Sequence, residues 1–169
     1  PGRNLIFASL VACQELPDQV WMGTMWDEDN EQATDKNSIF REMTSNLLTY
    51  VLSPFKTSIQ IRFPFVEEKM TKLDSVRWAL NHGISPEQLK ATTSCWHNTD
   101  GIPCGECKQC GKRMLVFELN GIQETYKVHP MSSVEQRNRF DDYVSLYNNG
   151  KANLDEETMA KMILLWKKI

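Results

Sequence analysis

Apolar residues recur at helical spacing along much of the chain, which predicts a series of amphipathic helices. Pro17 ends the first of these helices, and Gly83 marks a helix C-terminus. The expected helices cover residues 4–16, 38–52, 71–82, 112–118, 134–147 and 155–168, and Ser85-Pro86-Glu87 has the composition of a further helix start. Their apolar stripes include Leu5, Phe7, Ala8, Val11 and Ala12 in the first helix and Ile39, Met43, Leu47 and Tyr50 in the second.

Two short segments have the pattern of strands. Residues 19–23 form a brief apolar run, and residues 57–63 alternate so that Ile59, Ile61 and Phe63 share one face. Strands that alternate with helices predict a parallel α/β layer. Two strands are too few for an independently stable sheet. We therefore expect this chain to pair with another chain or to be the C-terminal part of a larger sheet domain.

The remaining segments divide the chain into two portions. Residues 24–37 are polar and acidic and form a long loop of the kind that is often functional. After His129-Pro130 the pattern becomes that of a helical pair. We expect an α/β portion over 1–122 and a helical extension over 123–169 that packs on this domain or on a partner.

Composition and charge narrow the class of protein. The chain has 169 residues, of which 41% are hydrophobic and 24% charged, with a net charge of -3. These values are typical of a globular protein and give no strong basic field for nucleic acid. The chain shows no signal peptide and no apolar run approaching the ~18 residues of a membrane span. We expect a soluble, cytoplasmic protein.

Four of the five cysteines lie together at Cys95, Cys104, Cys107 and Cys110. Two Cys-x2-Cys spacings allow thiolates to reach one ion through tight turns, and glycines follow both Cys104 and Cys110. Four sulfurs suit tetrahedral zinc and leave no position open for catalysis. The spacing therefore predicts a structural zinc site in a loop over 95–110.

Alternatives for these cysteines remain open at this stage. An iron–sulfur cluster also takes four thiolates. In a second alternative, His97 replaces one of the four thiolates as a metal ligand. Cys-x2-Cys pairs also occur in thiol redox chemistry. We expect the fifth cysteine, Cys13, to be a small buried hydrophobic residue of the first helix.

Three motifs together resemble one family. The first is Thr93-Ser94-Cys95-Trp96, followed by Cys104-Gly105-Glu106-Cys107-Lys108-Gln109-Cys110 and Arg113. The second is the opening Pro1-Gly2-Arg3-Asn4, and the third is Thr71-Lys72. In order and distance they resemble the 7-cyano-7-deazaguanine synthases, over about residues 1–122.

The resemblance implies a fold and a chemistry. The fold is a doubly wound parallel sheet of the adenine-nucleotide α-hydrolase-like type, in the pyrophosphate-loop ATPase superfamily. This chain would be its C-terminal part with the four-cysteine zinc loop, followed by the helical extension. The reaction uses ATP and Mg²⁺ to activate the carboxylate of 7-carboxy-7-deazaguanine as an adenylate. Ammonia then gives an amide, and a second activation gives the nitrile.

The resemblance also suggests binding residues, while the catalytic residues remain unknown. Arg3 and Asn4 would contact nucleotide phosphate or base, although Asn4 could simply cap the first helix. Lys72 would neutralise phosphate charge, or it could be an exposed helix lysine. Asp35 would accept hydrogen bonds from a guanine-like edge, or it could be a solvated loop acid. Arg113 would pair with a substrate anion or brace the zinc loop.

The chain departs from the family pattern in three places. It has no Gly-Gly and no phosphate loop, so we expect that loop upstream of Pro1 or on a second chain. Residues 30–37 replace the usual Ser-Gly-Tyr-Pro-Asp-Cys-Arg run, with only Asp35 matching well. The third departure is the extension beyond about residue 130.

Three hypotheses follow. The first is an ATP-dependent ligase of the synthase type. The second is a relative that attaches a deazaguanine to a protein or nucleic acid, for example in antiphage defence. The third is a zinc-stabilised binding module without catalysis. The partners expected are ATP, a 7-deazaguanine base and a portion carrying the phosphate loop, while a protein acceptor and a homo-oligomer remain open.

Overall fold

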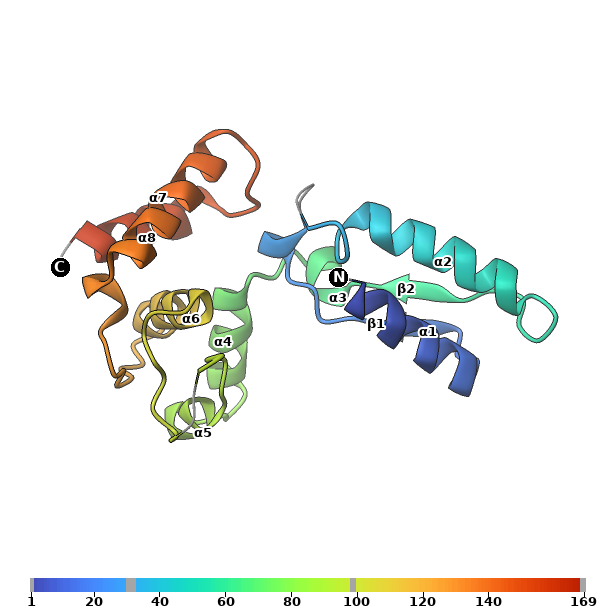
Figure 1. The fold of residues 1–169 in the computed structure, drawn as a ribbon, viewed down its shortest axis with the longest axis horizontal. Helices are drawn as coiled ribbons and strands as arrows, with labels where there is room; N and C mark the ends of the chain where they lie inside the picture. The colour runs from blue at the N-terminus through green and yellow to red at the C-terminus, as the bar shows by residue number, and fades with distance from the viewer. Residues whose placement is uncertain (1, 30–32, 98–99, 168–169) are drawn as a thin grey trace. The chain divides into compact units, whose positions relative to one another are not determined.

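The structure is a computed structural model that describes residues 2–29, 33–97 and 100–167. The described chain is largely helical and contains a two-stranded parallel sheet (Figure 1). It divides into two compact units, one formed by residues 1–71 with 151–153 and the other by residues 72–150 with 154–169. None of the described helices has both the length and the hydrophobicity that a membrane span needs.

The first unit contains both strands and the helices that accompany them. The strands are β1 (Gln19–Trp21) and β2 (Gln60–Arg62), and Val20 lies opposite Ile61 in the parallel register. Both strands lie within the segments predicted as strands, and their parallel pairing agrees with the prediction from strands that alternate with helices. The helices of this unit are α1 (Arg3–Glu15), the 3-10 turn η1 (Trp26–Glu28), α2 (Ser38–Leu52) and the short α3 (Pro64–Glu67), which the pattern did not predict.

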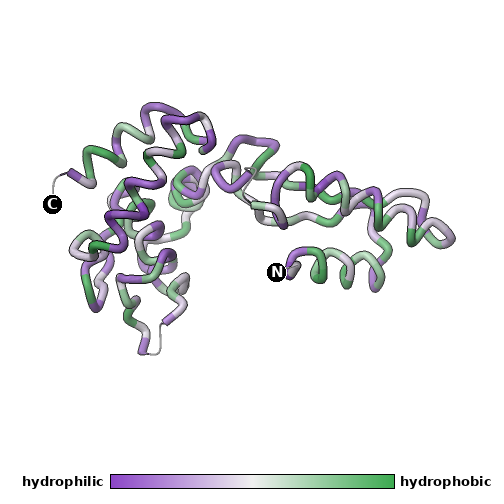
Figure 2. Tube along the Cα trace, turned by 45° about the horizontal axis from the view of Figure 1, so that its top comes forward, coloured by the Kyte–Doolittle hydropathy of each residue, from purple (hydrophilic) through white to green (hydrophobic). Residues whose placement is uncertain are grey.

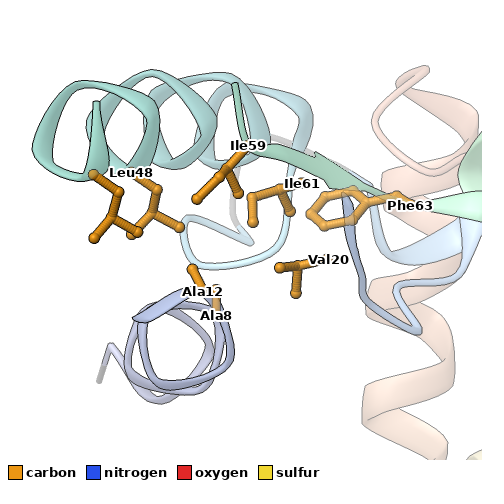
Figure 3. Packing of buried hydrophobic residues seen from close by; sticks show 8 residues of the cluster. Ala8, Ala12, Val20, Leu48, Ile59, Ile61 and Phe63 are labelled. Atoms are coloured by element: carbon orange, nitrogen blue, oxygen red, sulfur yellow. The ribbon is translucent and has the colours of Figure 1, made fainter. Parts of the chain in front are cut away.

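One face of the small sheet forms the core of the first unit. Ile59, Ile61 and Phe63 are at most 2% exposed, as their alternation predicted. Figure 3 shows these side chains, with Val20, pointing into the space between α1 and α2. The cluster consists of Ala8, Ala12, Val20, Leu48, Leu52, Ile59, Ile61 and Phe63.

The two long helices of the first unit differ in how their predicted stripes meet this core. α1 contributes Ala8 and Ala12, while most of its larger apolar residues are exposed. α2 contributes Thr44, Leu48 and Leu52, so its predicted stripe lies on the surface of the described chain. Figure 2 shows hydrophobic positions repeating along both helices. The exposed members of the two predicted stripes are Leu5, Phe7 and Val11 in α1 and Ile39, Met43, Leu47 and Tyr50 in α2.

The two edges of the sheet differ. On the outer side of β2, the Thr49 hydroxyl accepts from the Ile59 N–H at 3.0 Å and donates to the Ile59 carbonyl at 3.1 Å. The Ser45 hydroxyl accepts from the Ile61 N–H at 2.9 Å. Side chains of α2 thus satisfy this edge, as native sheets commonly do to prevent further pairing. The described residues place no strand on the outer side of β1.

The second unit is helical. Its helices are α4 (Lys72–Asn81), α5 (Pro86–Ala91), α6 (Lys108–Leu119), the 3-10 turn η2 (Pro130–Ser132), α7 (Val134–Asn148) and α8 (Glu156–Lys167). α5 begins with the capping box expected at Ser85. α6 starts four residues before its predicted start. The helical pair after residue 130 is confirmed, and Phe140 of α7 stacks on Trp166 of α8.

Candidate functional site

Four cysteine thiols converge in the second unit. Cys95 and Cys104 come from the segment between α5 and α6, Cys107 is the N-cap residue of α6, and Cys110 lies in its first turn. The four sulfurs all lie within 4.8 Å of one another, with Cys104 and Cys110 3.9 Å apart. Tetrahedral zinc with Zn–S bonds of ~2.3 Å places its sulfurs about 3.8 Å apart. The arrangement therefore fits a closed four-thiolate site.

Backbone N–H groups point at these sulfurs. The Cys95 sulfur accepts from the N–H groups of His97 and Cys104, each at 3.3 Å, and the Cys104 sulfur accepts from the Cys107 N–H at 3.4 Å. The loop thus directs hydrogen-bond donors at the sulfurs that would bind a metal.

Cys107 and Cys110 have opposite pKa shifts. Burial opposes ionisation of Cys107, but backbone N–H groups, including that of Trp96, lower the pKa of its thiol to about 7. Burial, together with the thiols of Cys107 and Cys95, raises the pKa of Cys110. A divalent cation would favour the thiolate at both positions, because metal binding requires deprotonated sulfur.

The alternatives for the cysteines can now be compared. Among the described residues, the group of neighbouring ligands contains the four cysteines and no histidine. His97 contributes its backbone N–H rather than a ring nitrogen. The expectation for Cys13 was wrong, because its side chain is exposed on α1. The small buried residues of α1 are Ala8 and Ala12 instead.

Gly105 lets the cysteine loop pack against a later segment. Its φ is +85°, and a Cβ atom there would lie 1.6 Å from the Val128 carbonyl oxygen. The Val128 N–H donates to the Cys104 carbonyl at 3.2 Å, and the Lys127 N–H donates to the Pro103 carbonyl at 2.9 Å. A side chain at Gly105 would therefore displace backbone, so only glycine fits this turn.

Arg113 is 4% exposed and is engaged within the unit. Its Nη2 lies 2.7 Å from Glu124 Oε1, and its Nε lies 2.8 Å from the other carboxylate oxygen. Nη1 donates to the Thr92 hydroxyl at 3.0 Å, and Nη2 also donates to the Leu89 carbonyl at 3.1 Å. These contacts join α6 to the residues on both sides of the cysteine loop, which supports the bracing role over substrate pairing.

Asn4 and Asp35 come together in the first unit. The Asn4 side-chain amide donates to the Asp35 backbone carbonyl at 3.0 Å. Gly2 is the N-cap residue of α1 and makes no side-chain cap bond, so the capping alternative for Asn4 was wrong. Arg3 is exposed at the first position of α1. Residues 30–32 of the long loop, and Pro1, lie outside the described residues.

Lys72 is half-buried at the first position of α4, in the second unit. A depression of about 510 Å³ lies between α2 and β2, lined by residues such as Arg41, Thr49 and Gln60. It contains none of the predicted site residues. The binding roles of Arg3, Asn4, Asp35 and Lys72 stay predictions.

Two residues near the cysteines gave no signal in the sequence. Glu124 follows α6 and is the buried partner of Arg113. Gln136 lies in α7, is 3% exposed, and donates to carbonyls of the cysteine loop. Neither residue belongs to a recognisable motif. The glycine after Cys110 is the closest indication, because Gln136 occupies the space that a side chain at Gly111 would need.

Comparison with known proteins gave consistent matches. The family model described as "Queuosine biosynthesis protein QueC" matches residues 1–121. The 7-cyano-7-deazaguanine synthase of a Nitratiruptor species is 30% identical over 127 residues, covering 73% of this chain and 54% of the relative. The synthase of Methanothermobacter thermautotrophicus is 32% identical over 126 residues, covering 73% and 53%.

The matches cover a larger share of this chain than of its relatives. The chain spans about half the length of the curated relatives it matches. The 7-cyano-7-deazaguanine synthase of Nautilia profundicola, for example, is 31% identical and is covered over 54% of its length. No solved structure matches the chain.

Proposed function

The chain belongs to the family of the queuosine biosynthesis protein QueC, and we propose that it forms the zinc-braced, substrate-facing part of an ATP-dependent ligase of the 7-cyano-7-deazaguanine synthase type. The observation that carries the proposal is the closed four-thiol centre, which lies within the matched residues 1–121. Two relatives that match 73% of the chain are named 7-cyano-7-deazaguanine synthase.

The proposed reaction has two activations. A carboxylate oxygen of 7-carboxy-7-deazaguanine attacks the α-phosphorus of ATP, and pyrophosphate leaves. Ammonia then attacks the acyl carbon and AMP leaves, which gives the amide. A second ATP activates the amide oxygen in the same way, and loss of AMP and protons gives the nitrile. Mg²⁺ would offset the charge of the phosphates.

Zinc has a supporting role in this proposal. Cys95, Cys104, Cys107 and Cys110 would hold it, and with four sulfurs bound it offers no position for substrate. Its chemistry would be to fix the loop and the start of α6. The Arg113–Glu124 pair continues this support one turn further along α6, where both side chains are at most 7% exposed.

We assign contacts with the nucleotide and the base to residues of the first unit and, separately, a phosphate contact to Lys72 of the second unit. Asn4 would hold the loop at Asp35 in place through its 3.0 Å bond, so that the loop can present its polar groups to the base. Arg3 and Lys72 would supply positive charge to phosphate, since both stand at the first position of a helix. Positive side chains add there to the favourable field that a helix N-terminus gives an anion.

The phosphate loop would come from an N-terminal portion or a second chain, and the sheet supports this. The parallel register directs the backbone groups of Val20 toward β2 and those of Gln19 and Trp21 toward the opposite edge. That edge pairs with no strand among the described residues. On α1, Ile6, Phe7 and Leu10 are 56–61% exposed. A further parallel strand with its covering elements would satisfy both features.

The test uses the intact, zinc-loaded protein together with the portion that carries the phosphate loop. It is incubated with ATP, Mg²⁺, ammonium and 7-carboxy-7-deazaguanine, and AMP and the base are followed by mass spectrometry. The proposal expects AMP that depends on the acid, and conversion of the acid to amide and nitrile. Absence of acid-dependent AMP from that complete protein would instead favour the non-catalytic binding module.

A second candidate keeps the activation and changes the acceptor. It is favoured by the α7–α8 pair, which lies beyond the matched residues 1–121 and yet contacts the cysteine loop. In this version the activated deazaguanine acyl group passes to an amine of a protein or nucleic acid, and AMP leaves. Acid-dependent AMP without nitrile, together with a mass increase on the acceptor, would identify it.

A further inference from the structure

The buried amide of Gln136 binds the turn between two of the candidate zinc ligands. Its Nε2 donates to the Cys107 carbonyl at 2.6 Å and to the Gly105 carbonyl at 3.2 Å. Gln136 lies in the first turn of α7, beyond the residues that the family model matches. A side chain that is 3% exposed needs such acceptors, because a buried amide without them is costly.

The Cys107 carbonyl also accepts the first hydrogen bonds of α6. The Cys107 carbonyl accepts from the N–H of Cys110 at 2.9 Å and from the N–H of Gly111 at 3.3 Å. The Gln136 amide is therefore a third donor at the group that joins the Cys-x2-Cys turn to the helix. A shift of this carbonyl would move the sulfurs of both Cys107 and Cys110.

Two neighbouring features fit α7 to this turn. A Cβ atom at Gly111 would lie 2.5 Å from Gln136 Oε1, so the absence of a side chain there makes room for the amide. One turn further along α7, Arg139 Nη1 donates to the Glu106 carbonyl at 3.1 Å. Three successive carbonyls of the turn, those of Gly105, Glu106 and Cys107, thus accept from α7.

We propose that Gln136 is a positioning residue of the four-cysteine site, and that through it docking of α7 and metal binding stabilise each other. Groups that orient ligands from outside the coordination shell typically contribute 10–100-fold to metal affinity. Coupling between two binding events is reciprocal. A loaded site therefore holds α7 more firmly, just as a docked α7 raises the affinity for zinc. The inference rests on the metal site and is independent of the proposed reaction.

The test compares zinc affinity in variants of the full chain. Gln136→Leu keeps the bulk of the side chain and removes the donor, so competition with a chromogenic chelator should show roughly 10-fold weaker zinc binding. Asn138→Leu, at an exposed position of the same helix, should bind zinc as the parent does. Phe140→Leu weakens the packing of α7 away from the turn but keeps the Gln136 donor, so it should lower unfolding stability and weaken zinc binding less than Gln136→Leu does.

Gly111→Ala provides a second route to the same question. The added methyl displaces the Gln136 amide while favouring the helix at that position. Weaker zinc binding in Gly111→Ala would therefore follow from loss of the Gln136 contact and not from a weaker α6.

Hydrogen exchange measures the same coupling as the effect of zinc on α7. In the parent chain, removal of zinc should speed amide exchange in α7, and this difference should shrink in Gln136→Leu. Parent-like zinc affinity in both Gln136→Leu and Gly111→Ala would overturn the inference. An amide exchange rate in α7 of the parent that is the same with and without zinc would also overturn it.

Discussion

The side-chain amide of Asn4 donates to the backbone carbonyl of Asp35 at 3.0 Å, which ties the start of α1 to the long loop before α2. These two residues come from separate motifs, and both were predicted on the substrate side. The contact explains why an asparagine stands at the second position of α1, where it caps nothing. It makes the position of the loop depend on the first turn of the helix.

Replacing Asn4 should loosen the loop. In Asn4→Ala the loss of one hydrogen bond of about 0.5–1.5 kcal/mol would raise the KM for the deazaguanine substrate in the complete enzyme by ~2–10-fold. Steady-state kinetics with the base as the varied substrate would measure this. Asn46→Ala, at an exposed position of α2, is the matched control and should leave KM unchanged. An unchanged KM in Asn4→Ala would remove the loop from the base site.

Breaking the Arg113–Glu124 pair should cost much of the stability of the second unit. Removal of one partner leaves a buried charge, since the two side chains are 5% and 7% exposed, and such losses are about 3–5 kcal/mol. Denaturant unfolding of Arg113→Met should show this loss. The double variant Arg113→Met, Glu124→Leu should recover much of it. Parent-like stability with weaker substrate binding would instead restore the substrate role of Arg113.

The Thr49 hydroxyl should be needed to close the β2 edge. Thr49→Val keeps the shape but leaves the Ile59 N–H and carbonyl without their partner, at a cost of about 1–3 kcal/mol. Thermal unfolding would measure it, with the exposed Thr57→Val as a control that stays within about 0.5 kcal/mol of the parent. Equal stability of the two variants would contradict the closed edge.

Asp155 should make the stability of α8 depend on pH. The hydroxyl and the backbone N–H of Thr158 lower the pKa of the Asp155 carboxyl, and that N–H lies 2.8 Å from Asp155 Oδ1. A lowered pKa means that the stabilisation is present above the unfolded pKa of about 3.9, and is lost as pH falls through the lower folded value.

The difference in unfolding free energy between the parent and Asp155→Asn, measured at matched pH, isolates this contribution. The parent should lose its advantage over the variant as the medium becomes acid. A difference that stays constant with pH would show that the carboxylate does not titrate with folding.

Local patterns predicted the positions of helices and strands better than they predicted which faces are buried. The alternation of Ile59, Ile61 and Phe63 identified both the strand and its buried face. The stripe of α1 included the buried Ala8 and Ala12 together with exposed residues, whereas the stripe of α2 identified the helix but not its buried face. Both helices carry apolar residues on more than one side, so spacing alone could not select the buried one. In α1, Ala8 and Ala12 lie in the core in place of larger residues.

The cysteine site was predictable because its ligands lie close in sequence. The start of α6 was missed, since the helix begins inside the ligand motif with Cys107 as its N-cap. Glu124 and Gln136 were missed for a different reason. Their contacts are polar pairings between residues 11 to 31 positions apart, and these leave no periodic trace in a single sequence.

Metal analysis of the intact protein tests the central claim most directly. The account predicts one zinc per chain, no visible chromophore, and loss of the metal when any one of Cys95, Cys104, Cys107 and Cys110 is replaced by serine. Cys13→Ser, at an exposed position of α1, should keep the full zinc content. Iron with visible absorption, or a protein that binds no metal with all four thiols reduced, would contradict the account.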